Sequence, residues 1–261
     1  SCGRPPHKSF FPDGRRFAMD SEMNDPHPGP LRRGWTTGAC ATAAARAAYE
    51  ALVGRAFPDP VSIELPGGAQ ASFALATTEQ GPGFAKAGVI KDAGDDPDVT
   101  HGALILATVR LAAPGAGVCF KAGEGVGTVT RPGLALAPGE PAINPVPRDM
   151  MRKAITDAAA ALGGPVDVEI EIAIPGGEKI AERTLNGRLG IVGGLSILGT
   201  TGIVTPFSCA AWISSIHRGI DVARAVGAEH LAGATGSTSE KALQQHFALP
   251  DVALIEMGDF V

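Results

Sequence analysis

The hydrophobic residues of this chain follow two periods, one typical of helices and one typical of strands. An alanine-rich stretch from about 39 to 53 predicts a helix, with Thr36 or Thr37 as its cap and Gly54 as its stop. Between 166 and 174, apolar residues alternate with acidic ones, which predicts a strand with one buried face. These patterns together predict an α+β fold, with mixed or antiparallel sheets and packed helices.

Turn residues divide the chain into further elements. Residues 61–77 and 166–184 each contain two strand-like segments around a Pro-Gly-Gly sequence, so we predict a hairpin unit in both places. Pro147 begins a predicted helix that runs to about Leu162, where a Gly-Gly pair ends it. We therefore expect an α+β domain with two hairpin units over residues 31–205.

The pattern changes in the last part of the chain, residues 206–261. A predicted helix over 208–226 is followed by a short strand at 230–232, a glycine turn, a helix over 239–247 and a strand over 252–257. This order is typical of a βαβ unit, which predicts the start of an α/β, Rossmann-like region. The chain stops almost directly after the last strand, so we expect this region to be truncated.

Residues 1–30 contain Pro, Arg and His without periodicity. They also lack the apolar core of a signal peptide. We interpret them as a disordered leader or extension, with Met19 or Met23 as a candidate start.

Composition and charge argue against several classes of protein. The 261 residues are 44% hydrophobic, enough for one large core or two smaller ones. With 22 basic and 27 acidic residues the formal charge is -5, so we expect no nucleic acid partner and no attraction to anionic lipid. No apolar run reaches the roughly 18 residues of a membrane helix, so we expect no membrane span. Association of the chain with further copies of itself, as a homo-oligomer, is compatible with this composition.

The four cysteines are Cys2, Cys40, Cys119 and Cys209. Their wide spacing indicates neither a zinc site nor a disulfide scaffold, so we expect reduced thiols in the cytoplasm and no metal site. Cys40 lies inside a predicted helix without a histidine nearby in sequence, so we interpret it as core packing rather than as a nucleophile.

The densest polar cluster contains four carboxylates within seven residues, Asp92, Asp95, Asp96 and Asp98. Such a cluster repels itself unless a cation, backbone amides or a lysine satisfies it. It predicts either a site or an acidic turn in which Asp98 caps the next segment. His101 follows closely as a candidate base or ligand.

Three other segments could contact a ligand. Thr36 and Thr37 lie at the mouth of the first predicted helix, where free amides can hold an anion, although either residue could be only a cap. A proline-set turn presents Asn144 and Arg148. Glycine-rich stretches, such as 123–127, let a ligand approach bare backbone or serve only tight packing.

The ordered set of these segments closely resembles the CbiD family, the cobalt-precorrin-5B methyltransferases of the anaerobic cobalamin pathway. The resemblance covers residues 31–261. The segments that carry it are Arg33-Gly34-Trp35-Thr36-Thr37-Gly38, Lys91-Asp92-Ala93-Gly94-Asp95-Asp96-Pro97-Asp98, Gly123-Glu124-Gly125-Val126-Gly127, Thr130-Arg131-Pro132-Gly133-Leu134, Asn144-Pro145-Val146-Pro147-Arg148 and Leu198-Gly199-Thr200-Thr201-Gly202.

This resemblance implies an enzyme that moves a methyl group from S-adenosylmethionine to ring carbon 1 of a cobalt-containing corrin precursor, giving cobalt-precorrin-6A. The four aspartates would be the catalytic group, as proton acceptor or as partners of the sulfonium, with no single base assigned. Arginines on rigid turns suit the carboxylates of the macrocycle. The expected substrate-binding residues are Arg33, Thr36, Thr37, Arg131, Asn144 and Arg148.

The glycine turn in the last part of the chain is the expected S-adenosylmethionine site. Ligands of open α/β sheets lie beyond the carboxyl ends of strands, which indicates Gly233, Thr235, Gly236 and Ser237. The turn could also serve only as a connection. Two other functions stay open: a nicotinamide-dependent oxidoreductase that uses this turn, and a corrinoid- or nucleotide-binding module without catalysis.

Overall fold

The computed structural model describes residues 29–258 of the chain. Of these, residues 31–258 belong to one compact unit. The leader expected over residues 1–30 lies almost entirely outside the described residues, and so does Cys2. The domain division expected at residue 205 stays a prediction.

A mixed five-stranded sheet is the centre of the fold, with the order β4-β5-β6-β9-β7. Its first four strands pair antiparallel, and β7 pairs parallel with β9. The alternation predicted around residues 166–174 is confirmed, because Val168, Ile170 and Ile172 of β9 are buried. The strands are β4 (Thr77–Gly81), β5 (Phe84–Ile90), β6 (Leu104–Leu111), β7 (Val118–Ala122) and β9 (Val168–Ala173).

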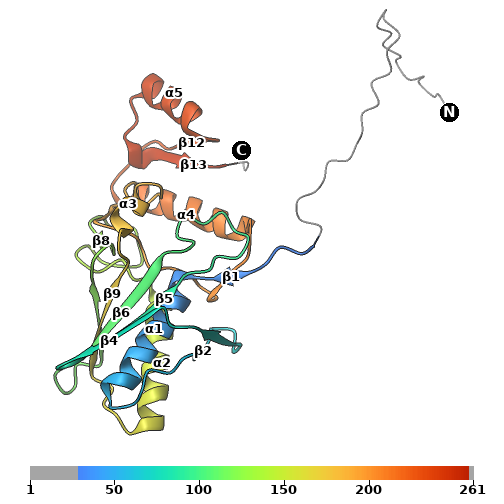
Figure 1. Cartoon of the computed structure of the whole chain (residues 1–261). Helices are drawn as coiled ribbons and strands as arrows, with labels where there is room; N and C mark the ends of the chain where they lie inside the picture. Colours follow the sequence, from blue (N-terminus) through green and yellow to red (C-terminus); the bar gives the residue numbers. More distant parts are fainter. Residues whose placement is uncertain (1–28, 259–261) are drawn as a thin grey trace, which may run out of the picture. The chain divides into compact units, whose positions relative to one another are not determined.

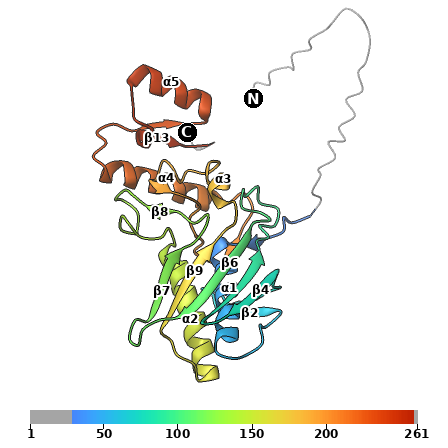
Figure 2. The same ribbon diagram turned by 60° about the vertical axis from the view of Figure 1, so that its left-hand side comes forward.

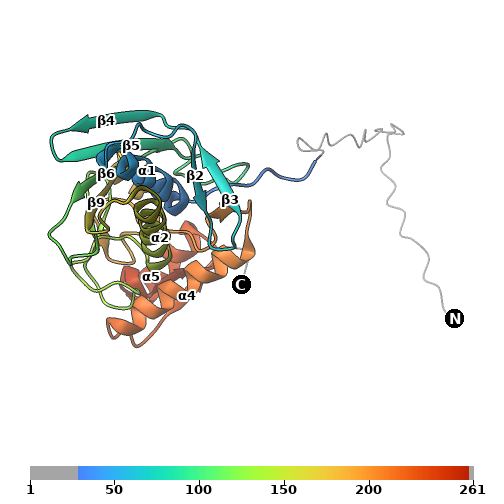
Figure 3. The ribbon, with the colours of Figure 1, turned by 90° about the horizontal axis from the view of Figure 1, so that it is seen from below.

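One predicted helix packs against this sheet, and a second lies beside the first (Figures 1 and 3). Helix α1 spans Thr37–Leu52 and α2 spans Pro145–Leu162. Alanines line nearly all of α1 and are buried, so its backbone comes close to β5, β6 and α2. Small side chains make this possible, because they leave little volume between the packed elements.

One of the two predicted hairpins is confirmed, and the other is wrong. Strands β2 (Val61–Glu64) and β3 (Gln70–Phe73) form the first. Where the second was expected, β9 ends and a short helix, α3 (Gly177–Ala181), follows. Both edges of β9 are already occupied, by β6 on one side and β7 on the other, so no edge is left for a hairpin partner.

The predicted βαβ unit is present near the end of the chain. Strand β12 pairs parallel with β13, and α5 lies alongside them (Figure 2). Strand β12 begins two residues later than predicted, because its ladder partners start only at Leu254. The elements here are α4 (Cys209–Ala225), β12 (Ala232–Ala234), α5 (Ser237–Phe247), the 3-10 helix η1 (Asp251–Ala253) and β13 (Leu254–Glu256).

Two short strand pairs join segments distant in sequence. Strand β1 (Gly34–Trp35) pairs with β11 (Ile203–Val204), and β8 (Thr128–Val129) pairs with β10 (Ile191–Val192). Of the helices within residues 29–258, none combines the length and the apolar character that crossing a membrane requires.

Candidate functional site

The structure brings four of the six segments that carry the family resemblance to one place. Strand β1 pairs with β11 on one side. On the other, the Trp35 N–H donates to the carbonyl of Asp92 at 2.7 Å, which joins β1 to the acidic segment. The Gly38 N–H donates to the carbonyl of Leu198 at 3.1 Å, and a Cβ on Gly38 would collide with Pro147.

Two glycines allow the backbone of the acidic segment to lie directly on the β1 segment. A Cβ on Gly34 would collide with the backbone carbonyl of Ala93, and a Cβ on Gly94 would collide with the carbonyl of Arg32. Gly94 also has a φ of 69°, a left-handed conformation that favours glycine. The acidic segment is therefore fixed by contacts between two backbones.

Asp92 is held by a residue that the sequence analysis did not select. The Arg32 guanidinium forms a bidentate pair with it, through hydrogen bonds of 2.5 and 2.9 Å, and the Gly94 N–H donates at 2.9 Å. These hydrogen bonds, from Arg32 first, lower the pKa of Asp92 to about 2. Arg32 directly precedes a matched segment, which was the available signal in the sequence.

Backbone amides hold the next two carboxylates. The Arg32 N–H donates to Asp95 at 2.6 Å, and the Phe207 N–H donates to Asp96 at 2.9 Å. Each bond uses a single oxygen, Oδ2 of Asp95 and Oδ1 of Asp96. Among residues 29–258, no side chain or amide donates to the other oxygen of either group.

Asp98 pairs with a buried lysine. Lys91 is 1% exposed, and its Nζ lies 2.5 Å from Asp98 Oδ2. The Thr100 N–H and hydroxyl donate to Oδ1, at 2.8 and 2.6 Å. Burial opposes ionisation of Asp98, but Lys91 and Thr100 outweigh it and hold its pKa below the usual range. Asp98 therefore caps the segment that follows it, and both of its oxygens are used.

Burial also raises the pKa of the Cys40 thiol, to about 12. Cys40 is 0% exposed in the core. The thiol therefore stays protonated at neutral pH, as expected for core packing. Cys119 and Cys209 are free and exposed.

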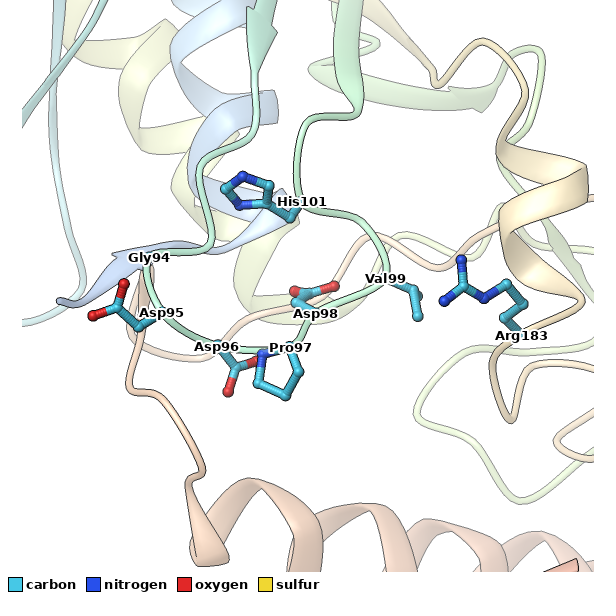
Figure 4. Close-up of a pocket in the computed structure, with 8 residues that line it drawn as sticks. All are labelled: Gly94, Asp95, Asp96, Pro97, Asp98, Val99, His101 and Arg183. Atoms are coloured by element: carbon cyan, nitrogen blue, oxygen red, sulfur yellow. The ribbon is translucent and has the colours of Figure 1, made fainter. Parts of the chain in front are cut away.

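An open cavity of about 460 Å³ lies against the acidic segment (Figure 4). Arg183 enters it from the far side, with its guanidinium pointing toward Val99. The Nδ1 atom of His101 accepts a hydrogen bond from the Ala93 N–H at 3.1 Å, which leaves Nε2 as its free nitrogen. The lining residues are Gly94, Asp95, Asp96, Pro97, Asp98, Val99, His101 and Arg183, so Asp92 is outside the cavity wall.

Thr36 acts as a helix cap. Its Oγ1 accepts a hydrogen bond from the Ala39 N–H at 3.2 Å. Thr36 and Thr37 are 7% and 4% exposed, and the loop around Leu198 covers the Gly38 amide. Capping therefore accounts for Thr36, and a role of either threonine in binding substrate stays a prediction.

Arg148 is occupied by its own turn. Its guanidinium donates to the carbonyls of Ile143 at 2.7 Å and Pro141 at 3.1 Å, and it lies 2.8 Å from Glu140. Asn144 occupies the cap position of α2 without a side-chain capping bond. To bind a substrate carboxylate, Arg148 would have to break these hydrogen bonds and form new ones to the substrate. The side-chain amide of Asn144 makes no capping hydrogen bond that would have to be broken.

Arg131 and Arg33 differ in whether the guanidinium group already has a hydrogen-bond partner. Arg131 donates to the carbonyl of Arg188 at 3.1 Å, and its aliphatic part packs on Gly190. Arg33 is exposed, forms a backbone bridge with Gly94, and has no ion-pair partner in the described part of the chain. Of the predicted arginines, Arg33 is therefore the one with an uncommitted guanidinium.

The predicted S-adenosylmethionine residues lie together at a helix start, apart from the lining of the acidic cavity. Gly233 lies within β12 rather than in the turn, and Gly236 precedes α5 without a side-chain capping bond. In the first turn of α5, Glu240 is 6% exposed and forms a bidentate pair with Arg188, at 2.6 and 2.5 Å. The first amides of α5 are thus available to a ligand.

Three or more His, Cys, Asp or Glu side chains do not come together as a metal site anywhere in residues 29–258. Two cations of the protein and backbone amides contact the carboxylates of the acidic segment, and one oxygen each of Asp95 and Asp96 is left without such a contact among these residues.

We expect the Arg32–Asp92 pair to contribute stability that disappears between about pH 4 and pH 2. The pKa of Asp92 is lower in the folded chain than its ordinary value of 3.8, so protons bind the unfolded chain more tightly and acid favours unfolding. The pair is largely exposed, so solvent screens it and the effect should be small. Urea unfolding of the wild type and Asp92→Asn should show a difference that shrinks over this range; a constant difference would contradict the assignment.

Comparisons with known proteins give a consistent result. The CbiD family model matches residues 24–206. A cobalt-precorrin-5B C(1)-methyltransferase of Bradyrhizobium sp. strain BTAi1 is 70% identical over 240 residues, which are 92% of this chain and 64% of that protein. The protein with the same name from Methylorubrum extorquens is 65% identical over 233 residues, covering 89% of this chain and 64% of that protein.

A solved structure is also similar. The crystal structure of the cobalamin biosynthesis protein cbiD from Archaeoglobus fulgidus has a TM-score of 0.54 and 29% identity. The match covers 87% of this chain and 71% of that one. The chain thus spans less than two thirds of the length of the curated relatives described above.

Proposed function

The chain belongs to the CbiD family, and from this premise we propose that it takes part in methyl transfer from S-adenosylmethionine to ring carbon 1 of cobalt-precorrin-5B. The observation that carries the proposal is the acidic cavity, which is lined by one segment of the family resemblance, 94–98, and that segment is packed backbone to backbone against a second one at Gly34. Fixed groups of this kind orient reactants, which is the main requirement of a direct displacement.

The chemistry of the cavity fits the methyl donor. S-adenosylmethionine, when bound, supplies an electrophilic methyl group on a positively charged sulfur. Asp95 and Asp96 each keep one carboxylate oxygen that receives no hydrogen bond from a described residue, and both line the cavity. We assign these two groups to the donor cation, and Asp92 and Asp98 to holding the turn, because their oxygens are already paired.

The macrocycle requires the opposite charge. Its acetate and propionate groups would be repelled by Asp95 and Asp96, so cations around the cavity must receive them. Arg183, across the cavity, and Arg33, on the β1 segment, have no ion-pair partner among residues 29–258. We therefore place these two arginines ahead of Arg131 and Arg148 as contacts for the substrate carboxylates.

Asp95 and Asp96 should act on donor affinity more than on the rate of the chemical step. A carboxylate stabilises a cation most while the positive charge is intact, and this charge disperses as the methyl group leaves. An interaction that is stronger in the ground state than in the transition state does not raise kcat.

The test uses the chain with S-adenosylmethionine and cobalt-precorrin-5B, read by the mass of the macrocycle. We expect the macrocycle to gain the mass of one methyl group. In Asp95→Asn and Asp96→Asn, the KM for the donor should rise up to about fivefold, as expected for loss of an exposed charge contact, with little change in kcat. Asparagine can still accept the backbone bonds from Arg32 and Phe207.

The control variant is Asp157→Asn, a half-exposed carboxylate on α2 away from the cavity, which should leave KM unchanged. S-adenosylhomocysteine has nearly the shape of the donor but a neutral sulfur. Comparing the affinities for the two ligands therefore measures the contribution of the positive charge. The wild type should bind the donor more tightly than this product, and the two variants should lose that preference. No mass gain with validated substrates would contradict the proposed function, and an unchanged preference would contradict the assignment of Asp95 and Asp96.

A second donor contact at Gly233, Thr235, Gly236 and Ser237 remains part of the proposal. The uncapped first amides of α5 support it, since such amides bind carboxylates.

A cytoplasmic location is proposed with the biosynthetic role. The binding module without catalysis stays the alternative, because the chain spans 64% of its relatives. A nicotinamide site is less favoured, because Gly233 lies within a strand.

A further inference from the structure

Phe207 has an unusual conformation beside the acidic cavity. Its φ of 53° lies in the left-handed region, which among the non-glycine residues of the described chain it shares only with Ala248. Its side chain is 67% exposed. Its N–H donates to Asp96, the same carboxylate that lines the cavity.

Nothing in the fold of the chain explains a phenylalanine at this position. A left-handed φ disfavours a bulky side chain and favours glycine, so the residue costs stability. An exposed ring recovers little of that cost, because it buries little apolar surface. Strain of this kind is kept where the side chain has another use, and here Asp96 holds the backbone that carries the ring.

We propose that the ring of Phe207 stacks on the apolar face of the corrinoid macrocycle, an inference that rests on the proposed function. Trp212 and Ile213, in the first turns of α4 that follow Phe207 in sequence, are also partly exposed, at 38% and 41%. A corrin is broad and conjugated, so it can cover several such side chains, and aromatic rings pack well against such faces.

Charge favours the macrocycle over the donor as the occupant. The cation of the donor is attracted to Asp95 and Asp96 inside the cavity. The carboxylates at the edge of the macrocycle are repelled there, so the macrocycle would lie outside the cavity, on the side where Phe207 is exposed. Asp96 touches both regions and thereby fixes the position of Phe207 relative to the donor.

The test compares the wild-type chain with Phe207→Gly, using cobyrinic acid as a stable cobalt corrinoid and S-adenosylhomocysteine as the donor probe. Quenching of Trp35 and Trp212 fluorescence reports corrinoid binding. We expect Phe207→Gly to bind cobyrinic acid at least tenfold more weakly, to bind S-adenosylhomocysteine equally well, and to unfold at a higher temperature because the backbone strain is relieved.

Phe247→Ala is the matched control, since that ring is 60% exposed at the end of α5. It should bind both probes like the wild type. Equal corrinoid affinity of the wild type and Phe207→Gly would overturn this inference and leave the proposed function intact. A lower melting temperature of Phe207→Gly, or a loss confined to S-adenosylhomocysteine, would overturn it too. A wild type that does not bind cobyrinic acid would overturn this inference as well, whereas the proposed function is decided separately by the mass of the macrocycle after incubation with its substrates.

Discussion

Replacing Lys91 with methionine is expected to lower the free energy of unfolding by about 3–5 kcal/mol, the range for removing one partner of a buried ion pair. Lys91 is 1% exposed, and its Nζ lies 2.5 Å from Asp98. The substitution leaves the Asp98 carboxylate with only the bonds from Thr100. Because Asp98 keeps 25% exposure, water reaches it in part and the loss should lie near the lower end.

Lys86→Met is the control for the same change of side chain. Lys86 lies on β5, close in sequence to Lys91, and pairs with Glu79 at 2.7 Å, but 32% and 55% of the two side chains are exposed. An exposed pair contributes about 0.2–1 kcal/mol. In the double variant Lys91→Met/Asp98→Asn, part of the lost stability should return because the unpaired charge is removed. Urea unfolding measures all three, and an equal, small loss for Lys91→Met and Lys86→Met would contradict the buried pair.

Gly94→Ala is expected to cost about 2–5 kcal/mol and to weaken donor binding more than Asp95→Asn or Asp96→Asn alone, because both carboxylates are displaced. The left-handed φ of Gly94 alone costs an alanine about 1–2 kcal/mol. The new Cβ also collides with the backbone of Arg32, Arg33 and Gly34, and overpacking adds about 1–3 kcal/mol. Backbone atoms cannot rotate away, so the acidic segment must move off β1 and Asp95 and Asp96 lose their positions.

Gly102→Ala separates the cost of the left-handed backbone conformation from the cost of the Cβ collision. Gly102 has a φ of 77°, and a Cβ there has nothing within 4 Å. It should therefore show the conformational cost alone, about 1–2 kcal/mol, with donor affinity unchanged. Thermal unfolding and S-adenosylmethionine titration of both variants are the measurements. If Gly102→Ala weakened donor binding as much as Gly94→Ala, backbone strain rather than the crossing with β1 would be the cause.

Donor binding and stability should therefore change together at several positions of this site. Lys91, Gly94 and Arg32 hold the acidic segment, but none of them supplies a free carboxylate oxygen to the cavity. Asp95 and Asp96 are different, because asparagine preserves their backbone bonds while removing charge. They are the positions where binding can be altered with the least change in stability.

Short-range patterns of the sequence determined much of the fold. The helix beginning at Thr37, the helix ending at Leu162 and the alternation along β9 were all predicted, because capping and burial of one face depend on residues within a few positions of one another. The order of the motifs also indicated the family. These features do not depend on contacts between residues that are distant in sequence.

The tertiary structure decided which side chains meet. The predicted second hairpin failed because β6 and β7, both distant in sequence, occupy the edges of β9. Arg131, one of the expected clamps, donates to the carbonyl of Arg188, a partner distant in sequence that only folding brings near.

The composition of the candidate site was decided in the same way. Arg32 lies 60 residues from Asp92, and Phe207 lies 111 residues from Asp96, so no local pattern pairs them. The four aspartates were visible in the sequence as a self-repelling cluster that needed partners. Which amides and cations satisfy it depended on where β1, β11 and the start of α4 lie, because hydrogen bonds and ion pairs form only over a few ångströms.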